Sequence, residues 1–350
     1  MLAPDNAVSE FALPAIDARA LARRVALPAL LGAAALATVA LAGGPVHRFA
    51  AALQHGLGAN GGWLAIGAGF EIVSLLGYVG LLSLVAGRAT NRVGLRESAQ
   101  ITLAGAAATR LLPTAGAGGA GLTLWSLRRA GLAPRDAART LLVFLVVLYS
   151  IFLAAIVLAG GALALGLVGN HGPLLLSAIP ALAAALCIAV ALRVSAGTWP
   201  GAARGTSSRV TRSARLLGDA VRDARALVRS GDARLAGAVG YWAFDAAVLW
   251  SMLHAFGSTA GLLVVVLAYF VGQVANTLPV PGSVSGGIAG VLIAFGAPAE
   301  VALPAVLAYR TIAVWLPTPV AIAAIPGLRS TLARWTHEDA AQTVNPAQAG

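Results

Sequence analysis

The chain has no lysine, and all 24 of its basic residues are arginine. It has a single cysteine, Cys187, so no disulfide can form within the chain. Charged residues occupy only 11% of the 350 positions, whereas hydrophobic residues occupy 59%. This is far more apolar side chain than one soluble core needs. The composition excludes an ordinary soluble domain and predicts an all-α integral membrane protein.

The side chains expected of an enzyme or a metalloprotein are also scarce. The five histidines are scattered without metal-ligand spacing, and no serine or cysteine has a histidine and an acid placed to activate it. We therefore expect no metal, no cofactor and no catalytic site. The net charge of +11 is first a signal of membrane topology and of attraction to anionic lipid head groups, so we expect no nucleic-acid partner.

Long runs of apolar residues are frequent along the chain. Six are long enough to cross a membrane, at residues 25–43, 63–86, 141–168, 174–192, 235–256 and 301–325. Arginines gather on the side that also holds both termini, which predicts cytoplasmic termini. Disordered tails are expected at 1–18 and 335–350, around a membrane domain at 19–334. An alternative for the first run is a signal peptide cleaved near Ala40–Ala42.

Two further apolar stretches break in their own middle. Residues 100–130 are interrupted at Pro113 and by the glycines that follow it, and residues 261–296 are interrupted between Pro279 and Gly282. Each piece is too short to cross, so each stretch predicts a re-entrant broken helix. The two copies predict an inverted repeat, with a first unit at about 62–168 and a second at about 235–326. The helix N-termini after Pro113 and Pro281 would present N–H groups to a phosphate.

The polar loop at 193–234 separates these units and holds nine arginines. It is either a solvated cytoplasmic connector or, where arginines alternate with apolar residues, an amphipathic helix on the inner leaflet.

Ionisable residues inside the apolar regions are costly, and we expect them to pair or to face a cavity. They are Glu71, Arg110, Asp245, His254, Glu300 and Arg310. In one interpretation they form structural ion pairs, Arg110 with Glu71 and Arg310 with Asp245. In the other, the two arginines bind the phosphate of an anionic lipid and the acids tune its release. His254 is interpreted as an interfacial residue.

The glycines at 116, 118 and 121 formally match G-x-G-x-x-G, but a nucleotide site needs a strand before the motif. Close helix packing is the preferred interpretation, and the spacing of Gly286 and Gly290 predicts the same.

Three motifs resemble the transmembrane region of the lysylphosphatidylglycerol synthase/flippase family: Arg110-Leu-Leu-Pro113, Asn276-Thr-Leu-Pro279-Val-Pro281-Gly282 and Ala308-Tyr309-Arg310. The resemblance covers about residues 19–334. It implies a polytopic bacterial inner-membrane protein that translocates an aminoacylated phospholipid between leaflets. The site positions implied by the motifs are Arg110, Pro113, Pro279, Pro281, Gly282 and Arg310. From the same stretches and the membrane acids we add Gly116, Asp245, Asn276 and Tyr309, with Glu71 and Glu300 as charge partners.

Two departures from the family pattern stand out. Ser283 replaces a glycine, and apolar residues occupy the place of a glutamate that relatives carry nearby. The chain also stops soon after Arg334, which leaves no room for an aminoacyl-transfer domain. We therefore expect binding and translocation of an anionic or aminoacylated phospholipid, or of a polyprenyl-linked lipid. The alternatives are a non-transporting partner of a lipid-modifying enzyme or glycosyltransferase, docked through the loop at 193–234, and an enzyme acting at the lipid interface.

Overall fold

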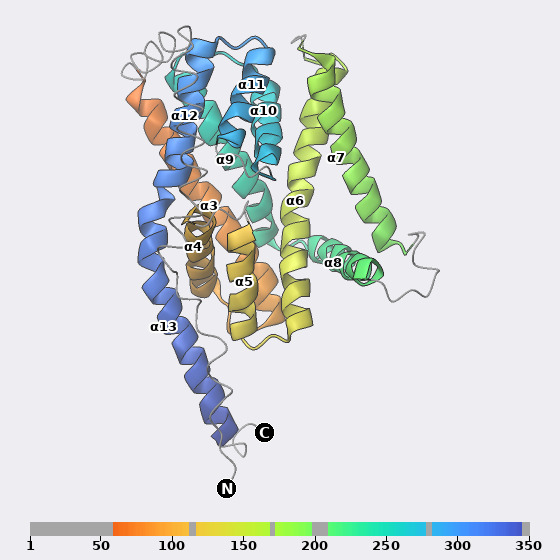
Figure 1. The fold of residues 1–350 in the computed structure, drawn as a ribbon, viewed down its shortest axis with the longest axis vertical. Coiled ribbons are helices and arrows are strands. Elements are labelled where there is room, and N and C mark those ends of the chain that lie inside the picture. Colours follow the sequence, from red (N-terminus) through yellow and green to blue (C-terminus); the bar gives the residue numbers. More distant parts are fainter. Residues whose placement is uncertain (1–58, 112–116, 169–171, 198–208, 278–281, 345–350) are drawn as a thin grey trace. The chain divides into compact units, whose positions relative to one another are not determined.

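The computed structural model describes residues 59–111, 117–168, 172–197, 209–277 and 282–344 (Figure 1). The chain divides into two compact units, Met1–Ala50 and Ala51–Gly350, and the first lies wholly outside the described residues. The expected first span at 25–43 and the tail at 1–18 therefore lie outside them too. Within the described ranges every regular element is helical and no strand occurs. This agrees with the all-α prediction.

The described elements follow one another as α3 (Gly61–Ala89), α4 (Leu95–Leu111), α5 (Ala117–Arg129), α6 (Pro134–Ala164), α7 (Leu174–Ser195), α8 (Arg209–Arg229), the 3₁₀ turn η2 (Ala233–Leu235), α9 (Ala236–Ala255), α10 (Leu262–Val274), the 3₁₀ turn η3 (Ala275–Thr277), α11 (Ser283–Ala294), α12 (Ala299–Trp315) and α13 (Pro317–Val344). Local sequence sets several of these boundaries. Asn60 caps α3 because its Oδ1 accepts a hydrogen bond from the Gly62 N–H at 2.9 Å. Pro134 begins α6, where its missing N–H costs nothing.

Four helical runs in the described ranges are long and apolar enough to cross a membrane: Gly61–Ala89, Pro134–Ala164, Leu174–Ser195 and Ala299–Ala340. They correspond to four of the six expected spans. The fifth, 235–256, is present as α9, but its apolar pattern is interrupted by Asp245 and it is not among the four. Leucines on α7, such as Leu175 and Leu182, are exposed on the bundle surface, as side chains that face lipid tails would be. The protein is an integral membrane bundle.

Helices α3 and α9 pack against each other through their backbones. A Cβ added to Gly77 would lie 2.7 Å from the Gly237 carbonyl oxygen, and one added to Gly237 would lie 2.3 Å from that of Gly77. The rings of Tyr78 and Tyr241 meet beside this contact, with centroids 5.1 Å apart. Small residues allow such an approach where helices meet within a membrane.

Two pairs of short helices, α4 with α5 and α10 with α11, pack side by side where the sequence predicts broken helices (Figure 1). Helices α10 and α11 have 13 and 12 residues. Each therefore rises only about 20 Å, less than the roughly 30 Å of a bilayer core.

Glycines bring the helices of each pair together, but only partly the ones we expected. In the first pair Gly119 lies against Gly105, whereas a Cβ at Gly121, one of the three glycines predicted to pack, would meet nothing within 4 Å, so the prediction was wrong for Gly121. In the second pair, a Cβ at Gly286 or Gly290 would meet nothing within 4 Å, so the packing predicted for those two was wrong. The face of α11 that meets α10 carries Gly287 instead, one residue along the helix.

The polar loop at 193–234 contains a helix, α8, which packs on α6 and α7. Its buried side chains are apolar and lie on one side: Ala220, Val221, Ala224 and Leu227. Residues 209–229 thus form an amphipathic helix whose apolar side packs on the protein, and its place on the inner leaflet stays a prediction.

The C-terminal helix corrects another expectation. We expected disorder from residue 335, but α13 continues to Val344. Trp335 is almost fully buried, and Arg92 on the α3–α4 loop donates a hydrogen bond to Asp339 at 2.5 Å. These contacts, distant in sequence, hold the helix in place.

Candidate functional site

A buried polar cluster lies where α9, α10 and α12 meet. The Tyr269 hydroxyl on α10 donates a hydrogen bond to Asp245 Oδ2 on α9 at 2.6 Å. Asp245 is 9% exposed and Tyr269 is fully buried. A carboxylate at this depth is costly, and the tyrosine hydroxyl offsets part of that cost.

The cluster continues onto α12. Gln273 Nε2, one turn along α10 from Tyr269, donates to the Tyr309 hydroxyl at 3.0 Å, and the rings of Tyr269 and Tyr309 meet edge to face with centroids 6.1 Å apart. Glu71 on α3 is 4% exposed, and its carboxylate and that of Asp245 both act electrostatically on Tyr309. Two carboxylates therefore influence one polar region inside an apolar bundle.

Arg310 follows Tyr309 on α12 and is half-buried. Among the described residues it forms no ion pair with Asp245, whose Oδ2 accepts from Tyr269. Consecutive helical residues point about 100° apart, so Arg310 does not share the direction of Tyr309. The structural pair expected between Arg310 and Asp245 is thus absent from this part of the chain.

The remaining expected site residues fall into two groups. The side chain of Arg110 and the whole of Pro113, Gly116, Pro279 and Pro281 lie outside the described residues, so the expected pair of Arg110 with Glu71 stays a prediction. The backbone places Arg110 next to the last residue of α4.

The second group lies at helix boundaries. Asn276 is exposed in η3, and Glu300 is exposed in the first turn of α12, where a carboxylate suits the helix dipole. Gly282 caps α11 with φ at +81°, a left-handed conformation that favours glycine. Within the described ranges, no three His, Cys, Asp or Glu side chains come together in a way that could hold a metal ion.

The sequence model of one family, described as the lysylphosphatidylglycerol synthase TM region, matches residues 25–321. The chain belongs to this family. The match takes in both helix pairs and the whole buried cluster, and it ends within α13. No curated protein matches the chain.

Two members of the cluster, Tyr269 and Gln273, were not predicted from the sequence. Neither side chain carries a charge, and an uncharged polar residue in an apolar run is less conspicuous than a charged one. The available signal was their spacing, because two polar residues four apart in an otherwise apolar helix share one face.

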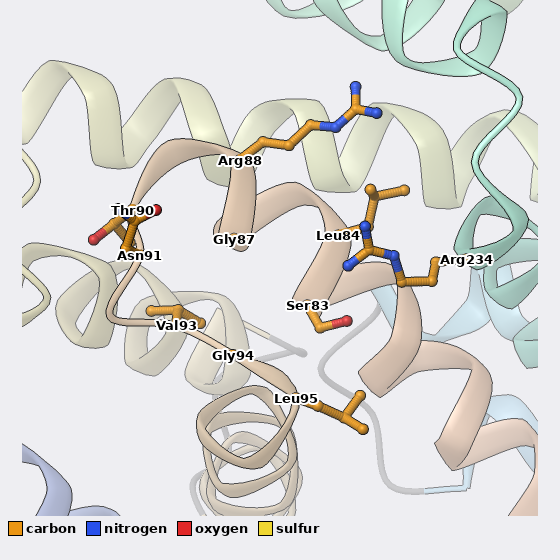
Figure 2. Close-up of a pocket in the computed structure, with 10 residues that line it drawn as sticks. All are labelled: Ser83, Leu84, Gly87, Arg88, Thr90, Asn91, Val93, Gly94, Leu95 and Arg234. Carbon is orange, nitrogen blue, oxygen red and sulfur yellow. The ribbon is translucent and has the colours of Figure 1, made fainter.

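A separate pocket of about 490 Å³ opens at the end of α3, between its last turns, the loop to α4 and Arg234 (Figure 2). Arg234 donates two side-chain hydrogen bonds to Asp232, at 3.0 and 2.8 Å, and these lower the pKa of Asp232 to about 2. Arg88 donates to the Ser230 hydroxyl at 3.0 Å and lies 3.9 Å from the same carboxylate. The single carboxylate of Asp232 thus lies beside two arginines, Arg88 and Arg234, so the net charge of this part of the pocket wall is positive.

Proposed function

We propose that the protein binds a phospholipid with an anionic or aminoacylated head group, or a polyprenyl-linked lipid, and translocates it between the leaflets of the bacterial inner membrane. The observation that carries this proposal is the polar cluster made of two hydrogen-bonded pairs, Asp245 with Tyr269 and Gln273 with Tyr309, with Glu71 nearby. Polar groups at membrane depth are costly and are kept where they form a path for a polar substrate. Membership of the family supports the same function.

The chemistry of the cluster suits a head group of mixed charge. The carboxylates of Glu71 and Asp245 would attract the amino group of an aminoacylated lipid. The guanidinium groups of Arg110 and Arg310 offer paired donors that match a phosphate. We expect the same site to disfavour a lipid whose head group carries neither charge.

An inverted repeat would place this site between two similar halves. The order long, short, short, long occurs in α3–α6, and it recurs from α9 onward when the last helix is taken as the continuous apolar run Ala299–Ala340 that α12 and α13 form together. Each short pair is closed by a glycine contact, Gly105 with Gly119 and Gly272 with Gly287. The first helices of the two halves touch reciprocally at Gly77 and Gly237. Transporters built this way bind substrate near the midplane, between the repeats.

The proposed topology has six crossings and two re-entrant pairs. It adds residues 25–43 and α9 to the four apolar runs. Arginines follow α3 at 92 and 96, end α5 at 128 and 129, and gather on α8. These clusters support a common cytoplasmic side, on which both termini also lie.

A second candidate function is that of a membrane partner for a lipid-modifying enzyme or glycosyltransferase. The observation in its favour is the outer side of α8, where Arg215, Arg225 and Arg229 are exposed and have no ion-pair partner in the described part of the chain. If this function holds instead, reversing these charges will abolish the activity of the partner, and the unchanged protein will move no more lipid than protein-free vesicles do.

The test of translocation uses purified protein in liposomes that carry a fluorescent phospholipid in both leaflets. A membrane-impermeant quencher outside reports how much lipid becomes accessible. We expect the wild type to make much more lipid accessible to the quencher than protein-free vesicles do. This accessibility should fall strongly in Arg310→Ala. It should not fall in Arg329→Ala, which removes an exposed arginine of α13 outside the candidate site. Equal movement in the two variants would refute the site assignment. No movement with anionic, aminoacylated or polyprenyl-linked lipids would refute translocation itself. If the protein is instead an enzyme, mass spectrometry of the recovered lipid would detect chemically modified lipid.

A further inference from the structure

The pair α4 and α5 is held together by polar as well as glycine contacts. The Gly119 N–H donates to the Thr109 hydroxyl at 2.9 Å, and a Cβ on Gly119 would lie 3.2 Å from the Gly105 carbonyl oxygen. At the opposite end, the Thr90 hydroxyl before α4 donates to the Ala130 carbonyl after α5 at 3.3 Å. The two helices are therefore antiparallel, and Gly105 and Gly119 mark the sides on which they face each other.

Helical periodicity then shows which other side chains share those sides. On α4, Ser98 and Thr102 lie within about 60° of the direction of Gly105. On α5, Thr123 and Ser126 lie within about 40° of the direction of Gly119. Ser98 is seven residues before Gly105 and Ser126 is seven residues after Gly119, so the two serines are level in an antiparallel pair.

Hydroxyl groups thus run along the inside of this helix pair, but they differ in their hydrogen bonding. The Thr109 hydroxyl, near the tip, donates to the Gly105 carbonyl, and the Thr123 hydroxyl, about level with Thr102, donates to the Gly119 carbonyl, each at 2.9 Å. The hydroxyl oxygens of Ser98, Thr102 and Ser126, by contrast, are buried and have no hydrogen-bond partner in the described part of the chain.

Three unpartnered hydroxyls in one helix pair are unusual, because buried polar groups in proteins are almost always hydrogen-bonded. Both serines are 0% exposed, so bulk solvent does not reach them in this conformation. Internal water is the usual partner of such groups, and each molecule makes two to four hydrogen bonds. The opposing helices present enough hydroxyls and helix carbonyls to supply those partners.

We propose that Ser98, Thr102 and Ser126 bind water inside the α4–α5 pair, and that this hydrated seam is the polar route by which a lipid head group reaches the end of α4. The second part rests on the translocation function proposed above. The seam begins beside the arginines that end α5 and runs as far as the Gly105–Gly119 contact, so the two helices must separate there before a head group reaches Thr109 and the last turn of α4, which carries Arg110. The α10–α11 pair differs, because among the described residues none of its buried side-chain oxygen or nitrogen atoms lacks a hydrogen-bond partner.

The test measures the reactivity of introduced thiols with a charged, membrane-impermeant methanethiosulfonate reagent, in nanodiscs that expose both membrane faces. The background is Cys187→Ser, because Cys187 is the single cysteine of the chain and is exposed. The seam variants are Ser98→Cys, Thr102→Cys and Ser126→Cys.

The matched controls are Ala104→Cys on α4 and Leu127→Cys on α5, which are similarly buried but point about 80–100° away from the facing sides. We expect the seam thiols to react at least tenfold faster than the controls. Equal rates in variants that elute as monodisperse protein would overturn the proposal. If one cysteine variant does not fold, the remaining seam variants supply the same comparison with the control positions.

The route is tested separately with Ser126→Ala and Thr102→Val, which remove hydroxyls and keep side-chain size. We expect lipid movement to fall at least tenfold in the double variant while the elution profile is unchanged. Reactive seam thiols with no lipid movement in the wild type would refute translocation and leave the hydrated seam standing. Lipid movement with unreactive seam thiols would refute the seam alone.

Discussion

The substitution Gly237→Ala tests the contact between α3 and α9 most directly. The new Cβ would lie 2.3 Å from the Gly77 carbonyl oxygen, whereas ordinary contacts begin at 3.4 Å. One helix must therefore move by about 1.1 Å, the difference between these two distances. The obstacle is backbone, which cannot rotate away as a side chain can. Overpacking of this kind costs about 1–3 kcal/mol.

The matched control is Gly240→Ala, three residues along the same helix, where the nearest atom would be a Phe244 ring carbon at 4.0 Å. Both variants gain about 1 kcal/mol of helix propensity, so this gain cancels between them. We expect Gly237→Ala to be less stable than Gly240→Ala by about 1–3 kcal/mol, or about 2 °C in unfolding midpoint per kcal/mol.

Thermal unfolding in detergent measures this difference, and the liposome assay shows whether the shifted helices still move lipid. Gly240→Ala should unfold at or slightly above the wild-type temperature. If the two variants unfold at the same temperature, α3 and α9 do not pack through Gly77 and Gly237, and the reciprocal contact that supports the repeat is lost.

Three further substitutions address other contacts. Tyr269→Phe removes the hydroxyl that donates to Asp245, and we expect a loss of about 1–3 kcal/mol in the free energy of unfolding because the carboxylate stays buried. Arg234→Gln should raise the pKa of Asp232 from about 2 towards its usual 3.8, and NMR of the labelled carboxyl carbon measures this change. In the wild type, the stabilisation by this pair is present above pH 3.8 and is lost as the pH falls through 2. Asp339→Asn removes an exposed ion pair, so we expect almost unchanged stability and faster proteolysis of the last turns of α13.

The elements that the sequence predicted well are those defined by local composition. The helix α3 and the long helices α6 and α7 follow from apolar runs, and the two short pairs follow from prolines and glycines that interrupt such runs. A charge in an apolar run is conspicuous, and Asp245, which was expected to face away from lipid, is buried; its role as a site residue stays a prediction. Each of these signals lies within one segment of the chain.

The elements it missed depend on contacts between distant segments. The end of α13 is polar, and its sequence alone predicts a disordered tail. Arg92, more than two hundred residues earlier, forms ion pairs with Glu338 and Asp339 at this end of the helix. Spacing alone suggested Gly286 and Gly290 as packing residues, yet only the position of α10 decides that Gly287 makes the contact. Tyr269 gained its role only from the carboxylate on the neighbouring helix.

The two short helix pairs occupy corresponding places in the proposed repeat but differ in chemistry. The closest contact of the α10–α11 pair joins Gly272 to Ile288 and Gly287, and the side chains of Tyr269 and Gln273 hydrogen-bond to α9 and α12. The α4–α5 pair keeps its hydroxyls inside, between its own helices. In a lipid translocator built from such halves, one pair would supply a fixed wall of the site and the other a hydrated way into it. In such a translocator, the difference between the two copies would give the head group a direction of entry.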